Sequence, residues 1–303
     1  MVEIQYLLQS LRPKQYIKNL VVFAAPFFSF RLDTILWYKS CGAFICFCLI
    51  SSAIYLFNDI IDIREDRLHP TKRFRPIAAS QVSITVAFKT LILLTIISLF
   101  LSKLLGIELF ILIFLYALLQ VFYCLCLKKI IILDVICISS GFILRAIAGG
   151  LVSDSIPSPW FLLTISLLAL FIAIEKRKEE LLLSKKYGIV FKKVLNFYSL
   201  KSLMILENFT SISAFISYSL WAYGPTFNGA PSKWMLLTSP MVLYCIIRYK
   251  LISSSKVSKS NYSISNQFIY ESPEEIFIKD SHLKYSFLIW LLTSIFVLAS
   301  TKN

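Results

Sequence analysis

The sequence predicts an all-α polytopic membrane protein with about nine transmembrane helices. Three observations lead to this fold class. Of the 303 residues, 57% are hydrophobic, and the mean hydropathy is +0.74, far above that of a soluble domain. Apolar runs of membrane-spanning length recur along the whole chain. Lysine and arginine gather in alternate connections between these runs, as the positive-inside rule requires.

Each apolar run is interpreted as one span, and the first is short and interrupted by Pro26. The predicted spans are 20–36, 38–57, 83–102, 107–127, 130–150, 159–175, 203–223, 234–249 and 284–300. No polar block is large enough for a separate soluble domain, so residues 1–303 are predicted to form a single integral membrane domain. Its cytoplasmic loops are predicted at about 58–82, 176–202 and 250–283. Ser272 and Pro273 predict that a helix starts within the last of these loops.

The basic residues define the expected orientation. With the N-terminus inside and the C-terminus outside, 25 of the 31 lysine and arginine residues lie in segments assigned to the cytoplasm. The net charge of +14 is therefore attributed to basic loops that face anionic lipid headgroups, and no nucleic-acid partner is expected. The expected location is the cell (plasma or inner) membrane. The oligomeric state stays open, and a homo-oligomer is compatible with the sequence.

Four polar residues follow the second apolar run: Asn58, Asp59, Asp62 and Asp66. If that helix continues, about 100° of rotation per residue places the three aspartates in one narrow sector. Aligned carboxylates repel one another unless a cation lies between them, and Mg²⁺ prefers oxygen ligands and completes its shell with phosphates. The alternative is a plain charged loop, which needs basic residues but has no need of aligned aspartates. Basic side chains that could bind phosphate oxygens or lipid headgroups come next, at Arg67, Lys72, Arg73 and Arg75.

Charged residues also occur at membrane depth. Arg145 lies well inside the fifth run, where a charge normally faces a cavity or a partner. Asp134 precedes it on nearly the same face but about 16 Å along the axis, so a shared polar cavity is expected rather than a direct salt bridge. The alternative is that Arg145 binds a carbonyl or reaches the interface. Lys18, ahead of the first run, either binds a phosphate or only sets topology.

A second charged helix end closes the sixth run, with Lys176, Arg177 and Glu180. Two polar helix ends at one membrane depth can face each other across a pocket, so this end is expected to lie opposite the aspartates. The alternative is a simple stop-transfer signal.

The motif Asn58-Asp59-x-x-Asp62-x-x-x-Asp66, together with the N-terminal RPKQYIKN, resembles the UbiA superfamily of intramembrane prenyltransferases. Within that superfamily the chain is similar to the decaprenyl-phosphate phosphoribosyltransferase branch. Several blocks carry this closer resemblance: DRLHPTKRFRPIAA after the motif, LDVICISSGFILRAIAGG at 133–150, KRKEEL at 176–181, YCIIRY at 244–249 and SPEEIFIKD at 272–280. The aromatic prenyltransferases of the superfamily carry a second aspartate-rich motif where this chain has Lys176, Arg177 and Glu180.

The resemblance implies a UbiA-like ring of nine helices around a pocket that opens to the cytoplasm and laterally to lipid. It implies Mg²⁺-dependent transfer of 5-phosphoribose from phosphoribosyl diphosphate to a polyprenyl (decaprenyl-like) phosphate, as in cell-envelope biosynthesis. Asp59, Asp62 and Asp66 would hold Mg²⁺ on the diphosphate, supported by Asn58.

Substrate contacts are expected from three further groups of residues. The 5-phosphate would bind Arg67, Lys72, Arg73 and Arg75, with Lys176 and Arg177 on the other wall. The lipid phosphate would bind Lys18, Lys128 and Arg145. Either Glu180 or Asp134 would stabilise the oxocarbenium-like carbon.

Two other functions stay open. An aromatic prenyltransferase would use a prenyl diphosphate and a quinone-precursor or phenolic acceptor, and the same first motif supports it. A non-enzymatic lipid-phosphate carrier would line a conduit with the same charged side chains. The polyprenyl chain length and the pathway are not encoded in a recognisable form.

Overall fold

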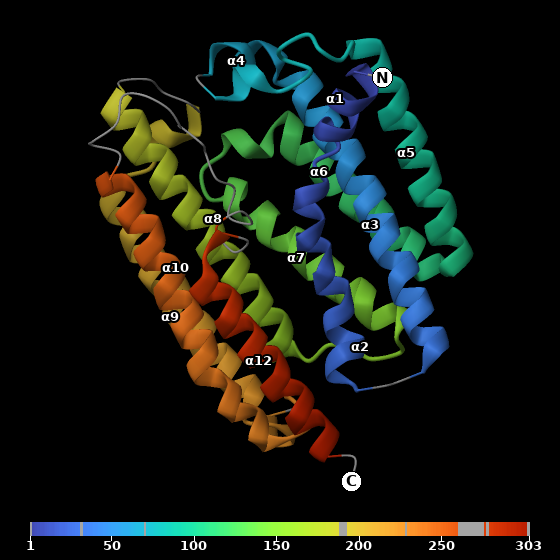
Figure 1. Cartoon of the computed structure of the whole chain (residues 1–303), viewed down its shortest axis with the longest axis vertical. Helices are drawn as coiled ribbons and strands as arrows, with labels where there is room; N and C mark the ends of the chain where they lie inside the picture. The colour runs from blue at the N-terminus through green and yellow to red at the C-terminus, as the bar shows by residue number, and fades with distance from the viewer. Residues whose placement is uncertain are drawn as a thin grey trace. The chain divides into compact units, whose positions relative to one another are not determined.

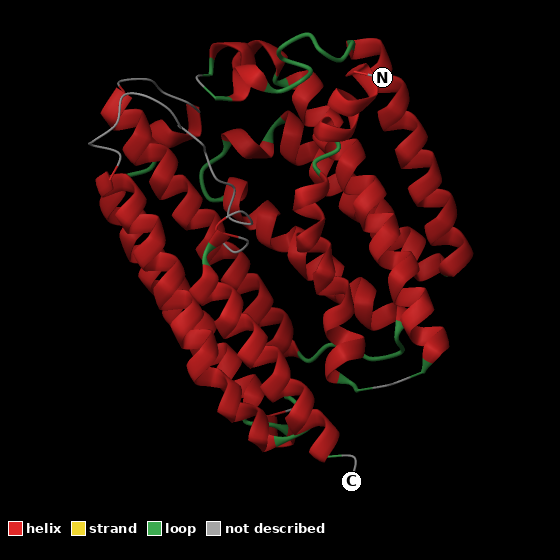
Figure 2. Ribbon diagram, in the orientation of Figure 1, coloured by secondary structure: helices red, strands yellow, loops and turns green. Residues whose placement is uncertain are grey.

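The computed structural model describes residues 2–30, 33–69, 71–187, 193–227, 229–259, 276 and 279–301. These residues form helices joined by turns, which confirms the predicted all-α class (Figure 2). Eight helical segments in this described part are long and apolar enough to cross a membrane: Thr34–Ile61, Ile84–Leu105, Ile107–Leu125, Leu133–Val152, Pro159–Leu182, Leu200–Ala222, Lys233–Ser253 and Ser281–Ser300. The predicted count of about nine is close. The difference is the run 20–36, where the 3₁₀ helix η1 (Pro13–Phe23) and the short α2 (Ala24–Phe28) replace one long α-helix.

The chain packs as two compact units. The first contains Met1–Phe27, Arg31–Ile130 and Leu144–Ile156, and the second contains Phe28–Phe30, Ile131–Ile143 and Pro157–Asn303. Each unit is described by itself below, and the single domain expected for 1–303 stays a prediction.

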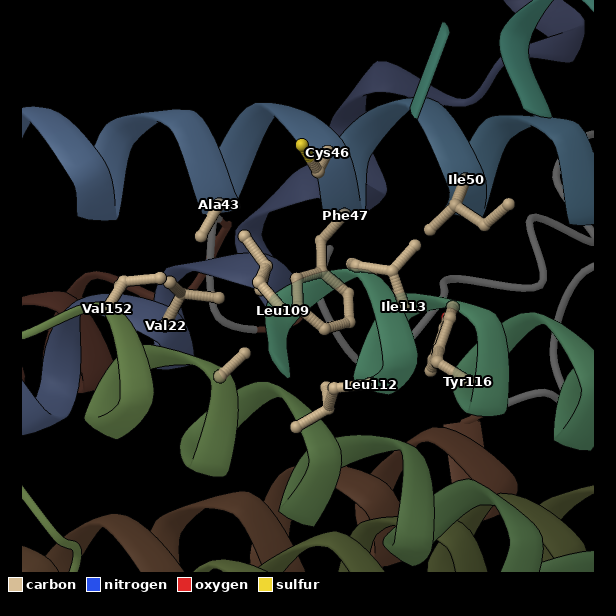
Figure 3. Close-up of a cluster of buried hydrophobic side chains, with 11 residues drawn as sticks. Val22, Ala43, Cys46, Phe47, Ile50, Leu109, Leu112, Ile113, Tyr116 and Val152 are labelled. Atoms are coloured by element: carbon tan, nitrogen blue, oxygen red, sulfur yellow. The ribbon is translucent and has the colours of Figure 1, made fainter. Parts of the chain in front are cut away.

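In the first unit, α3 (Thr34–Ile61) packs against α5, α6 and η1. The other elements of this unit are α1 (Val2–Ser10), α4 (Ile63–Leu68), η2 (Lys72–Phe74), α5 (Ile84–Leu105), α6 (Ile107–Leu125), η3 (Leu127–Lys129) and the second half of α7 (Leu133–Val152), labelled in part in Figure 1. Figure 3 shows the core of this unit, in which Phe47 of α3 lies among Leu109, Ile113 and Tyr116 of α6. By contrast, α5 exposes many apolar side chains, as a lipid-facing helix does.

Short-range chemistry fixes where these helices begin. The side chains of Asp33 and Ser83 accept hydrogen bonds from the backbone N–H groups of Ile35 and Val86, which caps α3 and α5. Gly106 joins α5 to α6 with φ 152°, a conformation that L side chains rarely adopt. Gly149 of α7 allows η1 to come close, because a Cβ added there would lie 2.0 Å from the Val22 carbonyl oxygen.

Replacing Gly149 by Ala is expected to destabilise the first unit by about 1–3 kcal/mol, because the new methyl group would push η1 away from α7. Gly42→Ala is the matched control. Its methyl group would meet the flexible end of the Leu105 side chain rather than backbone. Thermal unfolding in detergent should therefore show a clearly larger loss for Gly149→Ala. Equal effects would contradict the close-approach argument.

The second unit is built from helix pairs, α8 (Pro159–Tyr187) with α9 (Leu200–Ala222) and α10 (Ser239–Lys259) with α12 (Ser281–Ser300). The first half of α7 belongs to it, as do η4 (Lys193–Phe197), η5 (Pro225–Phe227) and η6 (Lys233–Thr238). Helices α8 and α10 run on to Tyr187 and Lys259, so the predicted loops 176–202 and 250–283 start too early. The apolar run ends at the first charges, but the helix continues through them. The helix start predicted at Ser272 and Pro273 lies outside the described residues.

Candidate active site

The acidic motif lies where α3 passes into α4. Asn58 and Asp59 end α3, Asp62 forms the junction and Asp66 lies in α4. The helical hydrogen bonds continue through the junction, since the N–H of Asp62 donates to Asn58 and that of Asp66 donates to Asp62, at 2.9 and 2.8 Å. The expected helical spacing of the aspartates is therefore largely kept. Asp59 and Asp66 are buried, whereas Asp62 is half-buried.

Two arginines neutralise the buried aspartates. Arg75 Nη1 lies 3.1 Å from Asp59 Oδ1 and 2.7 Å from Asp66 Oδ2, so one guanidinium nitrogen bridges both carboxylates. Arg12 Nη2 also donates to Asp59 Oδ1, at 2.5 Å, and its guanidinium lies over the Tyr55 ring. The sequence predicted Arg75 as a phosphate ligand, and the structure places it against the motif itself. Arg12 was missed, because nothing in Arg12-Pro13 indicates a partner 47 positions along the chain.

Asp62 has a different partner. Lys128 in η3 donates to both of its carboxylate oxygens, at 2.5 and 2.7 Å, and lies 3.3 Å from Asn58 Oδ1. The structure thus brings Asn58, the three aspartates and Lys128 together. Within this group, Arg75 pairs with Asp59 and Asp66, and Lys128 pairs with Asp62.

The other basic residues of this segment differ in position. Arg67 donates to the carbonyl of Ala78 and to the hydroxyl of Ser80, both at 3.0 Å, which ties α4 to the following turn. Lys72 acts electrostatically on Asp66, and the exposed Arg73 stacks on Phe74. Arg67 therefore shapes the segment, while Lys72 acts on the acidic site.

Burial changes the charge balance of this network. Burial alone would lower the pKa of the Arg12 guanidinium, but its contacts with Asp59 outweigh that effect and raise the pKa. Burial raises the pKa of the Asp66 carboxyl, and the nearby Arg75 and Lys72 offset the increase only in part. A further positive charge would therefore stabilise the Asp66 carboxylate.

The donor chemistry of the motif fits Mg²⁺, which takes carboxylate and amide oxygens. In the present arrangement, no group of three or more His, Cys, Asp or Glu side chains among the described residues could hold a metal ion. In this arrangement Arg75 lies between Asp59 and Asp66, and Lys128 contacts both oxygens of Asp62. The residues fit a divalent cation chemically, and they would have to exchange their cationic partners to bind it.

Arg145 is buried in the first unit among neutral polar groups. Its Nε donates to Asn19 Oδ1 and its Nη2 to the Tyr116 hydroxyl, both at 2.7 Å. It also lies over the rings of Phe47 and Tyr116. Arg145 thus has side-chain and ring partners at this depth, and the polar cavity that it would share with Asp134 stays a prediction. Lys18, the neighbour of Asn19, lies 3.4 Å from Gln15.

In the second unit, Arg177 joins two buried acids. Its Nε donates to Asp134 Oδ2 at 2.7 Å, and its Nη1 donates to Glu180. Tyr198 donates to Asp134 Oδ1 at 2.7 Å, and burial followed by this hydrogen bond raises the pKa of the Tyr198 hydroxyl. The N–H of Ile132 donates to the same hydroxyl, although Ile132 has φ 70°, which is rare for a β-branched residue. Lys176, in the same turn as Arg177, is half-buried.

A further ionic network in this unit was not predicted. Lys178 of α8 contacts Glu175 and Glu207, and Lys250 of α10 lies 2.9 Å from Glu207. Ser253 donates to Glu175 at 2.6 Å. The available signal was Glu207 itself, a single acid within an otherwise apolar run. The network holds α8, α9 and α10 together at their polar ends.

Comparisons with known proteins identify the family of the chain and its fold. A profile of the UbiA prenyltransferase family matches residues 20–270. The chain is 36% identical over 299 residues to "Decaprenyl-phosphate phosphoribosyltransferase" of Mycolicibacterium smegmatis, covering 95% of this chain and 90% of that protein. It is 31% identical to the protein of the same name in Mycobacterium tuberculosis, with coverage of 94% and 91%. A solved UbiA homologue from Archaeoglobus fulgidus, bound to DMAPP and Mg²⁺, superposes with a TM-score of 0.71 at 17% identity, covering 97% of this chain and 99% of that one, which shows the shared fold.

Proposed function

The chain belongs to the UbiA prenyltransferase family, and we propose that it transfers 5-phosphoribose from phosphoribosyl diphosphate to a polyprenyl phosphate. The observation that carries this proposal is the similarity, along nearly the whole chain, to proteins named for that reaction. The helix α8 supports it, because Lys176, Arg177 and Glu180 stand where a second aspartate-rich motif would serve a prenyl diphosphate.

The proposed reaction exchanges one bond for another. An oxygen of the acceptor phosphate bonds to C1 of the ribose while the bond between C1 and the diphosphate oxygen breaks. Because the acceptor phosphate is already anionic at neutral pH, no side chain has to remove a proton from it. The main requirement is stabilisation of the negative charge that develops on the leaving diphosphate.

Asp59, Asp62 and Asp66 would hold Mg²⁺, with Asn58 supporting one ligand. When bound there, the cation would neutralise charge on the leaving diphosphate. The protein's own contribution is to position these ligands: α3 and α4 carry the aspartates, and Lys128 holds Asp62 and Asn58 through direct hydrogen bonds until the cation takes its place on Asp62.

Two basic groups in the first unit are assigned to the phosphates. Lys72, which acts electrostatically on Asp66, and Arg73, its neighbour in η2, would bind the 5-phosphate, while Arg67 keeps their segment in place. Arg145 and Lys18 would bind the acceptor phosphate. Both act electrostatically on the Tyr55 hydroxyl of α3.

In the second unit, Lys176 would bind the donor, and Arg177 would hold Asp134 and Glu180 in place. Both oxygens of Asp134 are already engaged, one by Tyr198 and one by Arg177. We therefore assign the stabilisation of the oxocarbenium-like carbon to Glu180 and a positioning role to Asp134.

The test uses purified protein with phosphoribosyl diphosphate, Mg²⁺ and polyprenyl phosphates of several lengths, with products resolved by mass spectrometry. The lipid is expected to gain one phosphoribosyl unit. EDTA is expected to abolish the product, and added Mg²⁺ to restore it, because the leaving diphosphate loses its counter-charge.

Other outcomes would favour other functions. Absence of product at every lipid length, with turnover of a prenyl diphosphate and a phenolic acceptor, would indicate an aromatic prenyltransferase. Absence of any product in detergent, with lipid-phosphate movement in vesicles, would indicate a carrier.

A further inference from the structure

We propose that Arg75 is an internal counter-ion, which holds the place of the divalent cation between Asp59 and Asp66 and transfers to a phosphate oxygen of the donor when the metal–donor complex binds. This inference rests on the proposed function. It concerns how the charges of the acidic site are neutralised before the donor binds. Arg75 would first pair with the aspartates and then with a phosphate oxygen of the donor.

The geometry places the guanidinium where a shared cation would lie. Arg75 Nη1 is 3.1 Å from Asp59 Oδ1 and 2.7 Å from Asp66 Oδ2. The two aspartates belong to different helices, α3 and α4, yet meet at this one nitrogen. Two buried carboxylates so close together repel each other strongly unless a positive charge lies between them. Arg75 supplies that charge from within the chain.

Exposure distinguishes Arg75 from the two aspartates. The Asp59 and Asp66 side chains are 3% and 4% exposed, whereas Arg75 is 25% exposed. The Arg75 side chain is therefore more accessible than the two acids, as is Arg12 at 21%. The backbone of Arg75 is extended ahead of Pro76, with φ −63° and ψ 139°. Ile77, which follows Pro76, is buried in an apolar cluster with Leu56. The Arg75 side chain can swing outward while its backbone stays anchored.

Arg12 would still neutralise Asp59 after Arg75 has left. It donates to the same oxygen, Asp59 Oδ1, at 2.5 Å, so this carboxylate keeps one partner when Arg75 leaves. Arg12 is held in the left-handed region, with φ 55° and ψ 57°, immediately before Pro13, and lies over Tyr55. Such a conformation is costly and persists only where the surroundings enforce it. Arg12 is the fixed counter-ion and Arg75 the exchangeable one.

The exchange has a measurable consequence, because a metal ion that binds the donor-free protein must compete with Arg75. The donor-free protein should therefore bind a divalent cation weakly. Removing the Arg75 charge should strengthen metal binding and, in the same variant, weaken donor binding. A purely structural arginine would not produce effects of opposite sign.

The experiment compares wild type with Arg75→Gln, using Mn²⁺ binding to the donor-free protein, followed by electron paramagnetic resonance. Mn²⁺ is expected to bind Arg75→Gln about tenfold more tightly. Phosphoribosyl diphosphate binding, measured by calorimetry, should weaken by a similar factor. Arg75→Lys retains the charge and should resemble wild type. Arg64→Gln removes an equal charge from an exposed position on α4 and should leave Mn²⁺ binding unchanged.

Unchanged or weaker Mn²⁺ binding in Arg75→Gln would overturn the inference, as would an equal gain in Arg64→Gln. If Arg75→Gln unfolds without metal, millimolar Mn²⁺ is expected to restore its thermal transition, and failure to do so would also overturn it. The proposed function is judged separately, because product formation by wild type does not depend on donor-free metal binding.

Discussion

Replacing Asp62 by Asn is expected to reduce phosphoribosyl transfer at least a hundredfold while the protein stays folded. The substitution keeps the shape of the side chain but removes the charge that would hold the cation on the leaving diphosphate, an effect of about 10²–10³ in rate for comparable electrostatic groups. Stability should change by less than about 1 kcal/mol, because the Asp62–Lys128 pair is partly exposed, at 18% and 17%.

The measurement is turnover per folded molecule, with folding followed by gel filtration and thermal unfolding in detergent. Glu65→Gln is the matched control, since it removes one acid from an exposed position in α4. It should retain activity. Undiminished turnover in Asp62→Asn would exclude Asp62 as a metal ligand.

The helices and the acidic motif could be predicted because their signals are local. Hydropathy over about twenty residues located eight of the spans, and the spacing of Asp59, Asp62 and Asp66 predicted a common helical path. Boundaries failed where the local signal stops, as in α8, whose charged end continues as helix to Tyr187. The run 20–36 failed for a related reason: it is apolar, but its backbone forms η1 and the short α2.

The partners of the charged side chains could not be predicted, because they depend on tertiary packing. Arg12 and Asp59 are 47 positions apart, and Lys128 and Asp62 are 66 apart. A sequence shows that a basic residue is present, but not whether a carboxylate of the same protein already holds it. Arg75 illustrates the difference, since its sequence context suggests a phosphate ligand and its position is between two aspartates.

Replacing Arg177 by Met is expected to destabilise the second unit by about 3–5 kcal/mol, because it leaves the buried carboxylates of Asp134 and Glu180 without their shared cation. The Arg177 and Asp134 side chains are only 3% and 0% exposed, so water cannot take over this role. Thermal unfolding in detergent measures the loss. Lys185→Met, at an exposed position of α8, is the control and should melt like wild type.

A second variant separates lost charge from lost packing. Adding Asp134→Asn to Arg177→Met removes one of the two carboxylate charges that lost Arg177 as a partner. The double variant should therefore recover part of the lost stability. Transfer activity should stay low in both, because Glu180 would no longer be held in place. If the double variant is less stable than Arg177→Met, packing of the guanidinium rather than its charge dominates. The Arg177 side chain would then contribute to the fold mainly through its shape.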